Sequence, residues 1–434
     1  MGELSKLARH CVKIGSGATP RGGKDAYLQS GPYSLIRSQN VYNDRFSLSG
    51  LAFISKEQAD ALSNVEVMQG DVLVNITGDS VARVCQVDPV VLPARVNQHV
   101  AIVRPNNKTL DSAFLRYWFV TRETQNHLLA LASAGATRPA LTKTMLENLT
   151  VPDVGIDDQR AIAAVLSALD DKIELNRRMN ETLEASARAL FRDWFVDFGP
   201  TRAKAQGRPA YLAPDLWSLF ADALDDEGKP EGWGWGALGD IFEIAPKEPL
   251  KSGAMAPYLE MAALPTAGAN SQLPVDREYS SGTRFRNGDT LLARITPCLE
   301  NGKTCYVQNL PNGAVGWGST EFIVLRAKSP VPPVVSYLIA RDEDFRRHAI
   351  RSMTGTSGRQ RANADAIFGY CVAVPSEPTI WLKLAELLNP TFDQIASNER
   401  ESRTLAETRD LLLPKLISGE IRVAQNGSDM GKLP

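Results

Sequence analysis

One helical segment occurs twice in this chain, and the two copies align without a gap at an offset of 222 residues. The first copy has a seam in which steps of four and three residues alternate, a pattern typical of a coiled coil. This seam comprises Ile162, Leu166, Leu169, Ile173, Asn176, Asn180, Leu183, Ala187, Leu190 and Trp194. The second copy carries Leu384, Leu388, Ile395, Asn398, Leu405 and Leu412. Such a repeat indicates an architecture of two similar units.

The two copies are expected to pack against each other. Asn176 and Asn398 are equivalent positions, and a polar residue on a seam fixes the register at some cost in stability. If one helix leads the chain away from a domain and the other returns it, the pair runs antiparallel. A helix over residues 160–198 would be about 60 Å long. Pro390 and Pro414 are expected to restrict the second helix near its ends. The alternative, an ordinary amphipathic surface helix, would show a wider apolar face.

Segments of strand and turn character precede both helices, which predicts an α+β fold with two tandem domains, an intramolecular antiparallel coiled coil and pseudo-two-fold symmetry. The linker expected between the units is rich in Pro and Gly, with a short helical piece near residues 216–224. The predicted segments are a first domain (1–155), a central helical spacer (156–199), a linker (200–235), a second domain (236–376), a C-terminal helical spacer (377–422) and a flexible tail (423–434).

The two predicted domains also echo each other in sequence. The run GDVL at 70–73, followed by Ile76-Thr77, recurs as GDTL at 288–291, followed by Ile295-Thr296. Ile102-Val103-Arg104 recurs as Val324-Leu325-Arg326. We therefore expect the two domains to share a fold and to differ in detail.

Composition limits the class of protein. With 43% hydrophobic and 23% charged residues, the chain is typical of a soluble globular protein. Its five cysteines are odd in number and lack a CxxC spacing, which favours a reducing cytoplasm over a disulfide framework. No run approaches the roughly 18 apolar residues of a membrane span, so no membrane contact is expected. A net charge of -2 argues against nonspecific nucleic-acid binding over the whole surface but leaves local basic faces open.

Catalytic and metal-binding motifs are poor throughout. Asn389-Pro390-Thr391-Phe392 is similar to the motif of adenine methyltransferases, but it lacks the second proline and lies inside the second helical repeat. Gly22-Gly23-Lys24-Asp25 fails the phosphate-binding loop pattern, and the GxG runs lack the third glycine of a dinucleotide site. The four histidines show no ligand spacing. We expect no catalytic residue, metal ligand or cofactor in this chain.

Several polar loops carry residue types that suit the edges of bases and phosphates. Arg, Asn and Gln can make bidentate contacts to guanine or adenine, while Lys, Ser and Thr hold phosphates. For any single loop, a solvated turn is the alternative. The first-domain candidates are Arg21, Lys24, Arg37, Ser38, Gln39, Asn97, Gln98, Thr137 and Arg138. Those of the second domain are Arg294, Thr296, Asn301, Lys303, Arg359, Gln360 and Arg361. Together they predict two faces that bind double-stranded DNA.

Several stretches carry a resemblance that extends over nearly the whole chain. The longest are FRNGDTLLARITPCLENGK (285–303) and STEFIVLR (319–326), and shorter ones are DQRAI (158–162), LFRDWFVDF (190–198), LPKLISGEI (413–421), GDVL (70–73) and NQHV (97–100). In these stretches the chain resembles the specificity subunit of type I restriction-modification enzymes.

The resemblance implies a noncatalytic subunit whose two target-recognition domains each read one half of a split DNA target. Its implied partners are two methyltransferase subunits, which bind S-adenosylmethionine and methylate adenine N6, and two motor-nuclease subunits, which use ATP and Mg²⁺. The helices would set the gap between half-sites and dock the methyltransferases near their ends. Trp194, Phe195 and Phe198 would suit such docking if they are exposed, although a core role is equally open.

Two functions of other classes compete with this interpretation. A self-contained methyltransferase or nuclease would bind S-adenosylmethionine or a metal without partners. A coiled-coil scaffold for proteins alone would not depend on the basic residues Arg294, Lys303 and Arg359.

Overall fold

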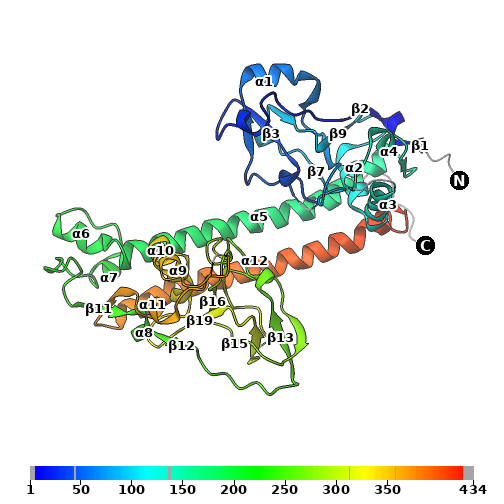
Figure 1. The fold of residues 1–434 in the computed structure, drawn as a ribbon. Coiled ribbons are helices and arrows are strands. Elements are labelled where there is room, and N and C mark those ends of the chain that lie inside the picture. Colours follow the sequence, from blue (N-terminus) through cyan, green and yellow to red (C-terminus); the bar gives the residue numbers. More distant parts are fainter. Residues whose placement is uncertain (1–4, 44, 135–137, 312, 357, 424–434) are drawn as a thin grey trace, which may run out of the picture. The chain divides into compact units, whose positions relative to one another are not determined.

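The computed structural model describes residues 5–43, 45–134, 138–311, 313–356 and 358–423. It divides into two compact units: unit 1 comprises residues 1–172 and 404–434, and unit 2 comprises residues 173–403. Each unit holds one mixed α+β domain and a part of each long helix, α5 (Ile156–Phe195) and α12 (Thr379–Ile417) (Figure 1). The predicted α+β class with two long helices is confirmed. The predicted tail from 424 onward lies outside the described residues.

Two four-stranded sheets form the domain of unit 1. The first is antiparallel, in the order β2 (Cys11–Ser16), β9 (Val100–Pro105), β6 (Val72–Asn75), β7 (Val84–Gln86). The second is mixed, in the order β4 (Ala52–Ile54), β3 (Tyr33–Ile36), β8 (Ala94–Val96), β5 (Glu66–Val67), and its β3–β8 pair is parallel. The strands are rich in buried Val, Leu and Ile, which suit a pleated surface covered on both faces.

Unit 2 repeats both sheets in the same strand order. Its antiparallel sheet is β12 (Phe242–Ile244), β19 (Phe322–Ala327), β16 (Thr290–Ala293), β17 (Thr304–Tyr306). Its mixed sheet is β14 (Val275–Glu278), β13 (Met255–Leu259), β18 (Gly316–Gly318), β15 (Thr283–Phe285), with β13–β18 parallel. The predicted duplication of the fold is therefore present at the level of sheet topology.

The remaining elements surround these sheets. In unit 1 they are β1 (Ser5–Lys6) paired with β10 (Thr150–Val151), α1 (Lys56–Ala61), α2 (Ser112–Val120), α3 (Arg122–Ser133) and α4 (Lys143–Glu147). In unit 2 they are α6 (Gly199–Ala205), α7 (Pro214–Trp217), α8 (Leu238–Ile241), α9 (Val334–Arg341), α10 (Glu343–Arg351), α11 (Ala364–Phe368), and β11 (Trp233–Ala237) paired with β20 (Cys371–Pro375). Among the described residues, no helix has the length and apolar character needed to span a membrane.

The sequence echo between the domains marks a duplicated ion pair. In unit 1, Arg104 on β9 donates to both oxygens of Asp71, at 2.6 and 2.8 Å. In unit 2, Arg326 on β19 donates to both oxygens of Asp289, at 2.7 Å each, and also meets Glu248 at 2.6 Å. Each aspartate is buried and lies directly before a strand, β6 or β16. The ion pair therefore joins that strand to its neighbour in the sheet, β9 or β19.

In unit 1, a largely buried carboxylate on α5, 18% exposed, joins both long helices to the domain. Asp170 accepts hydrogen bonds from Arg116 (2.5 Å) and Tyr117 (2.7 Å) on α2 and from Arg409 (2.6 Å) on α12. Burial alone would raise the pKa of Asp170, but the two guanidinium groups outweigh it and lower that pKa below its usual value. Around this hub, Ile162 on α5 belongs to the same apolar core as residues of α2 and α12.

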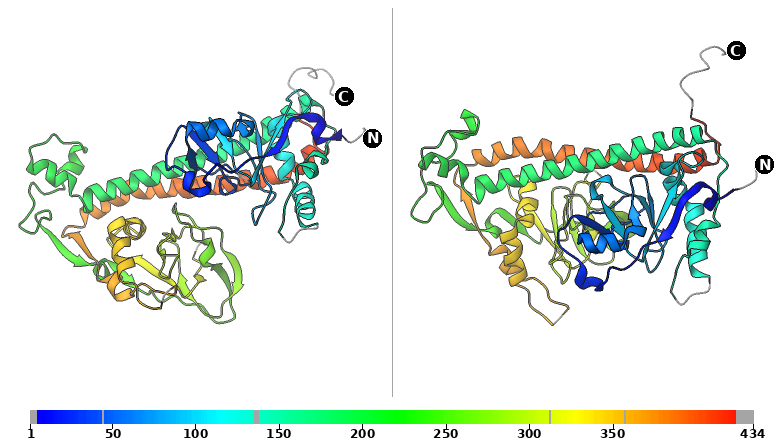
Figure 2. Two further views of the ribbon diagram at one scale, coloured as in Figure 1. Left: turned by 45° about the horizontal axis from the view of Figure 1, so that its top comes forward. Right: turned by 90° about the horizontal axis from the view of Figure 1, so that it is seen from above.

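In unit 2, polar residues on the helix seam pair as predicted. Asn176 donates to the backbone carbonyl of Asn398 (3.4 Å) and to Glu401 (2.8 Å), and Asn398 donates to the side chain of Asn180 (2.8 Å). As numbers rise along α5 the partners on α12 fall, since Asn180 also reaches the carbonyl of Ile395 (3.3 Å). The helices run side by side and antiparallel within this unit (Figure 2). Helix α12 continues through both Pro390 and Pro414, so neither proline ends it.

A second buried carboxylate on α5 anchors the domain of unit 2. Glu184 accepts a hydrogen bond from the Tyr337 hydroxyl on α9 (2.6 Å), and Arg341 donates to that hydroxyl from one turn away (3.1 Å). The Arg341 guanidinium also donates to four backbone carbonyls of the domain, those of Thr266, Gly268, Gly302 and Thr304. One side chain thus ties loops and strands of the domain to α5.

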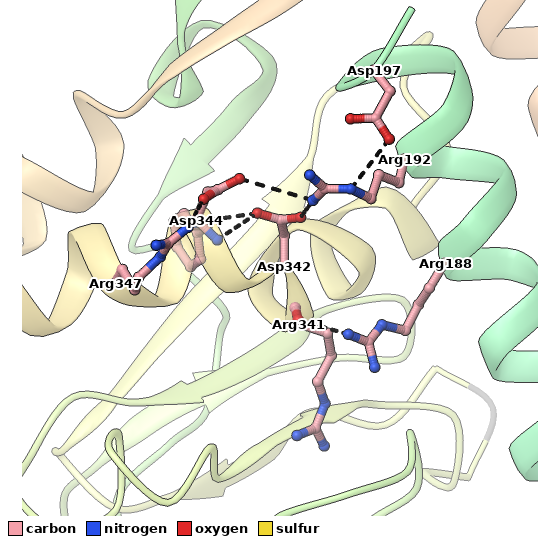
Figure 3. A network of polar contacts seen from close by, with 8 residues as sticks. Arg188, Arg192, Asp197, Arg341, Asp342, Asp344 and Arg347 are labelled. Atoms are coloured by element: carbon pink, nitrogen blue, oxygen red, sulfur yellow. Dashed lines mark hydrogen bonds and ion pairs between the residues drawn. The ribbon is translucent and has the colours of Figure 1, made fainter. Parts of the chain in front are cut away.

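Further contacts hold the start of α10 against α5 (Figure 3). Arg188 donates to the carbonyl of Arg341 (3.2 Å), and Arg192 donates to Asp342 (3.1 Å) while meeting Asp197 at 3.3 Å. Asp342 also caps α10, because its other oxygen accepts two backbone N–H groups of the first turn. The orientation of α10 is therefore fixed by the helix that carries the domain.

The ion pair of unit 2 generates a stability prediction. Arg326→Leu would leave Asp289 and Glu248 buried without their cation, so we expect unfolding to require about 3–5 kcal/mol less free energy. Urea unfolding followed by tryptophan fluorescence measures this change. Arg351→Leu, an exposed arginine of the same unit, is the matched control and should stay within about 0.5 kcal/mol of the parent. Equal losses in both variants would contradict the assigned role.

A pH prediction concerns Asp170. Because its pKa is lowered in the folded chain, its contribution to stability is present above about pH 4 and is lost as the pH falls through the folded value. We expect Asp170→Asn to reduce amide-exchange protection of α2 by about 3 kcal/mol at pH 7. The difference between variant and parent should shrink as the pH falls from 5 to 3. Asp171→Asn, at the exposed neighbouring position, should change neither value.

Candidate nucleic-acid interface

In unit 1, three chain segments meet where β6 ends and β9 begins. The Ile76 N–H donates to the carbonyl of His99 (2.9 Å), and the Leu141 N–H donates to the carbonyl of Ile76 (2.8 Å). The Gly78 N–H donates to the carbonyl of Pro139 (3.3 Å). We call residues 76–78, 99 and 139–141 the unit 1 junction. It brings together three segments that are far apart in the sequence, and two of them adjoin the predicted residues Gln98 and Arg138.

Unit 2 contains the same backbone arrangement. The Arg294 N–H donates to the carbonyl of Glu321 (3.0 Å), the Ala362 N–H to that of Arg294 (2.8 Å), and the Thr296 N–H to that of Gln360 (3.0 Å). We call residues 294–296, 321 and 360–362 the unit 2 junction. It too lies at the end of the central strand of an antiparallel sheet.

The shared hydrogen bonds define which positions correspond. Ile76 matches Arg294, and His99 matches Glu321, because each pair makes the same backbone contact. The isolated bridges Thr77–Ala140 and Ile295–Arg361 are also equivalent, so Ala140 of unit 1 corresponds to Arg361 of unit 2. The two junctions therefore have one backbone frame and different side chains.

Side chains of the unit 1 junction form a polar row. The Thr19 hydroxyl donates to the Gln98 Oε1 (2.6 Å), and the Gln98 Nε2 lies 3.0 Å from the His99 ring. The other nitrogen of His99 lies 2.6 Å from the Thr77 hydroxyl. Donors and acceptors are thus lined up along the mouth of the junction, which is the chemistry that base edges match.

This row borders an open hollow of about 410 Å³. Buried Asn75 fixes its rim, because its amide donates to the carbonyl of Ser38 (2.8 Å) and to the Ser80 hydroxyl (3.1 Å). The Arg83 guanidinium lies 4.8 Å from the centre of the Tyr42 ring, inside the same lining. The hollow is lined by Ser38, Gln39, Tyr42, Thr77, Gly78, Asp79, Ser80, Arg83 and His99.

The unit 2 junction is built around charge instead. Arg361 donates from Nε to both oxygens of Glu321 (2.9 Å each) and from Nη2 to one of them (2.7 Å). Arg294 lies on the same carboxylate, with Nε 3.5 Å from Oε2. The hydrogen bonds from Arg361 lower the pKa of Glu321, so the carboxylate stays ionised at neutral pH. Two cations and one anion leave the junction with a net positive charge.

The structure gathers some predicted DNA-binding residues at the junctions and leaves others outside them. Those at or beside a junction are Ser38, Gln39, Gln98, Arg138, Arg294, Thr296, Arg359, Gln360 and Arg361. Arg21 and Lys24 are exposed on the chain that follows Thr19, and Asn301 is exposed on the turn before β17. Thr137 lies outside the described residues. Contacts of these residues with bases and phosphates stay predictions.

Three predicted residues have clear structural partners. Asn97 is buried, and its side chain accepts the His99 N–H (3.1 Å). The Lys303 ammonium donates to the carbonyl of Met261 (2.8 Å), and Arg37 donates to the carbonyl of Gly50 (2.5 Å). These contacts shape the loops, and contacts of the three residues with DNA stay a prediction.

Sequence reasoning missed Thr77, Arg83, His99 and Glu321. Thr77 belongs to the repeated Ile-Thr pair, and Glu321 lies in one of the family-like stretches. Both positions could therefore have been selected as candidates from the sequence. Nothing in the sequence around Arg83 distinguishes it from other surface arginines. Its place in the hollow depends on Tyr42, which is far from it in the chain.

The aromatic residues at the end of α5 are buried, and not exposed as a docking role would require. Trp194 is 0% exposed and packs edge-on against Phe220, with ring centres 5.0 Å apart. Phe195 stacks on Trp381 at 4.3 Å, and Phe198 is also buried. The segment predicted as a linker contributes residues to this core. The short helix predicted near 216–224 corresponds to α7, which ends at Trp217. Of the two roles left open, the aromatics have the core role.

The methyltransferase-like motif has no exposed loop around it. Asn389 to Phe392 lie within α12, and Phe392 is buried with ring contacts to Tyr306 (5.7 Å) and Tyr337 (5.9 Å). Its aromatic residue therefore serves the core of unit 2.

Residues 11–185 match a family model described as the type I restriction modification DNA specificity domain. The chain is 27% identical over 348 residues to the specificity subunit of the type I restriction enzyme MjaIX of Methanocaldococcus jannaschii, covering 77% of this chain and 74% of the relative. It is 25% identical over 447 residues to the HindI specificity subunit of Haemophilus influenzae, covering 89% and 94%.

A solved structure shares the fold over nearly the full length. It is the type I restriction-modification S subunit from M. genitalium, with a TM-score of 0.55 at 16% identity and 95% of each chain covered. Residues 11–185 thus carry the type I specificity domain of this family, and the chain is similar to type I restriction-modification specificity subunits over most of its length.

Proposed function

We propose that this chain is the noncatalytic recognition subunit of a type I complex and that each domain reads one half of a bipartite target. The observation that carries the proposal is the pair of junctions, which share a backbone frame but differ in side chains. A duplicated frame presents its loops to DNA in equivalent ways, while different side chains read different bases. A protein scaffold would have no use for this combination.

The long helices would set the distance between the two half-sites. Their antiparallel seam contains Asn176 and Asn398, whose buried hydrogen bonds favour one register. A spacer with a single register gives a single gap between half-sites. We include the gap length among the properties that this chain determines.

The same helices would dock two methyltransferase subunits. Large apolar side chains are exposed on their outer faces, at Leu175 and Met179 on α5 and at Leu382 and Leu387 on α12. Exposed apolar side chains on a helix pair are suited to packing against helices of a partner. In the proposed complex, the methyltransferases supply S-adenosylmethionine, and two motor-nuclease subunits supply the sites for ATP and Mg²⁺.

Methylation in cells tests the recognition role. We expect this chain, expressed with its partner methyltransferase, to produce a split motif with N6-methyladenine in both halves, detected by single-molecule sequencing of genomic DNA. The methyltransferase alone is the control and should give no such motif. Methylation without regard to sequence would reject the proposal. Binding of S-adenosylmethionine by the isolated chain would favour a self-contained enzyme instead.

Changing the helix length tests the spacer role. We expect seven residues inserted after Lys172 and seven after Arg403 to preserve the heptad register and lengthen the gap in the methylated motif. Seven residues add about 10 Å of helix, so the increase is at most about three base pairs. The sequenced motif gives the gap directly.

Insertion into one helix only is the matched control for this experiment. It adds the same residues but leaves the seam out of register, so methylation should fall rather than move to a longer gap. An unchanged gap in the double insertion would show that the helices do not determine the spacing.

A further inference from the structure

The carboxylate of Glu321 at the unit 2 junction forms ion pairs with two arginines, Arg294 and Arg361. The geometry points to Arg361 as a reader of guanine in the half-site of unit 2, with Glu321 as the residue that positions it. This inference rests on the proposed function, because it assumes that the junction faces DNA. It goes further by naming a base and the side chain that recognises it.

Arg361 is oriented for bidentate contact. Its Nε and Nη2 donate to Glu321, which occupies one edge of the planar guanidinium group. Nη1 has no hydrogen-bond partner among the described residues, and the side chain remains 44% exposed. The second edge of the guanidinium, formed by Nη1 and Nη2, therefore stays available. A pair of parallel N–H donors matches O6 and N7 of guanine, the most common specific contact of arginine in the major groove.

Glu321 is itself held firmly. Its backbone carbonyl accepts the Arg294 N–H at 3.0 Å, directly before β19, and its side chain is only 22% exposed. The carboxylate meets Arg294 at 3.5 Å on one side and Arg361 on the other. Restricting the rotamers of Arg361 before DNA arrives lowers the entropy lost on binding. The second arginine keeps the local charge positive, so the carboxylate does not repel the phosphates.

Unit 1 shows that the backbone frame does not require these side chains. The positions that match Arg294, Glu321 and Arg361 are Ile76, His99 and Ala140, and the backbone hydrogen bonds are retained. A charged triad that served only to hold the frame together would be needed in both domains. Its restriction to unit 2 favours a role in what that domain recognises.

The first test compares methylation motifs of complexes that contain the full chain. Arg361→Ala should reduce the preference for guanine at one position of one half-site by about tenfold or more, while preferences at the other positions remain. Glu321→Gln should weaken the preference at the same position by a smaller factor. Arg361→Lys should not restore it, because lysine lacks the planar pair of donors. Arg351→Ala, at an exposed position of the same unit, should leave the motif unchanged.

The second test begins with the unaltered chain, so its first result does not depend on the folding of a variant. Replacing each guanine of the motif in turn by 7-deazaguanine removes the N7 acceptor alone. We expect one replacement to weaken binding of the complex by about fivefold or more, and the Arg361→Ala complex to be insensitive to that replacement.

Three outcomes would overturn the inference without touching the proposed function. The first is a methylation motif that Arg361→Ala leaves unchanged. The second is weaker binding of the Arg361→Ala complex by the same factor on all sequences, as expected of a phosphate contact. The third is a motif in which no guanine is sensitive to the loss of N7. Failure of the proposed function would be recognised separately, since the unaltered complex would then methylate no split motif at all.

Discussion

Buried polar contacts on α5 are the constraint on which the rest of the structure depends. Asp170 in unit 1 and Glu184 in unit 2 each accept a hydrogen bond from a tyrosine, Tyr117 on α2 or Tyr337 on α9. Removing the partners of a buried carboxylate is costly, so these contacts hold that helix of each domain against α5. The domain and the spacer cannot shift independently. The loops that would contact DNA therefore inherit their position from α5.

The two anchors are equivalent in purpose but not in detail. Asp170 is surrounded by Arg116 and Arg409, so its negative charge is balanced directly by two arginines. Glu184 is linked to the Arg341 cation through the tyrosine hydroxyl. The other N–H groups of Arg341 donate to backbone carbonyls. In both anchors, a few side chains supply the hydrogen bonds that the carboxylate accepts. The duplication has preserved the tyrosine and allowed the charges around it to change.

The sequence predicted what depends on periodicity and on local repeats. The helical seam, the antiparallel pairing and the shared fold all follow from spacing, and the echo of Asp71 and Arg104 by Asp289 and Arg326 coincides with a duplicated ion pair. Burial of Trp194 could not be predicted in this way, because Phe220 covers it from a segment whose composition indicates a linker. The junctions were equally hidden, since each depends on hydrogen bonds between three distant segments.

A backbone frame that tolerates different side chains explains how such a subunit could change its target without losing its fold. The hydrogen bonds of the junction involve main-chain N–H and carbonyl groups, so Ile76 and Arg294 satisfy the same contact with unrelated side chains. Substitution there costs little stability as long as the new side chain reaches solvent or a neighbour. The anchors on α5 do not have this freedom, because Asp170 and Glu184 are buried among fixed partners. Under the proposed function, selection can therefore act on the junction alone, and a new half-site preference would require no change in the helices proposed to set the spacing.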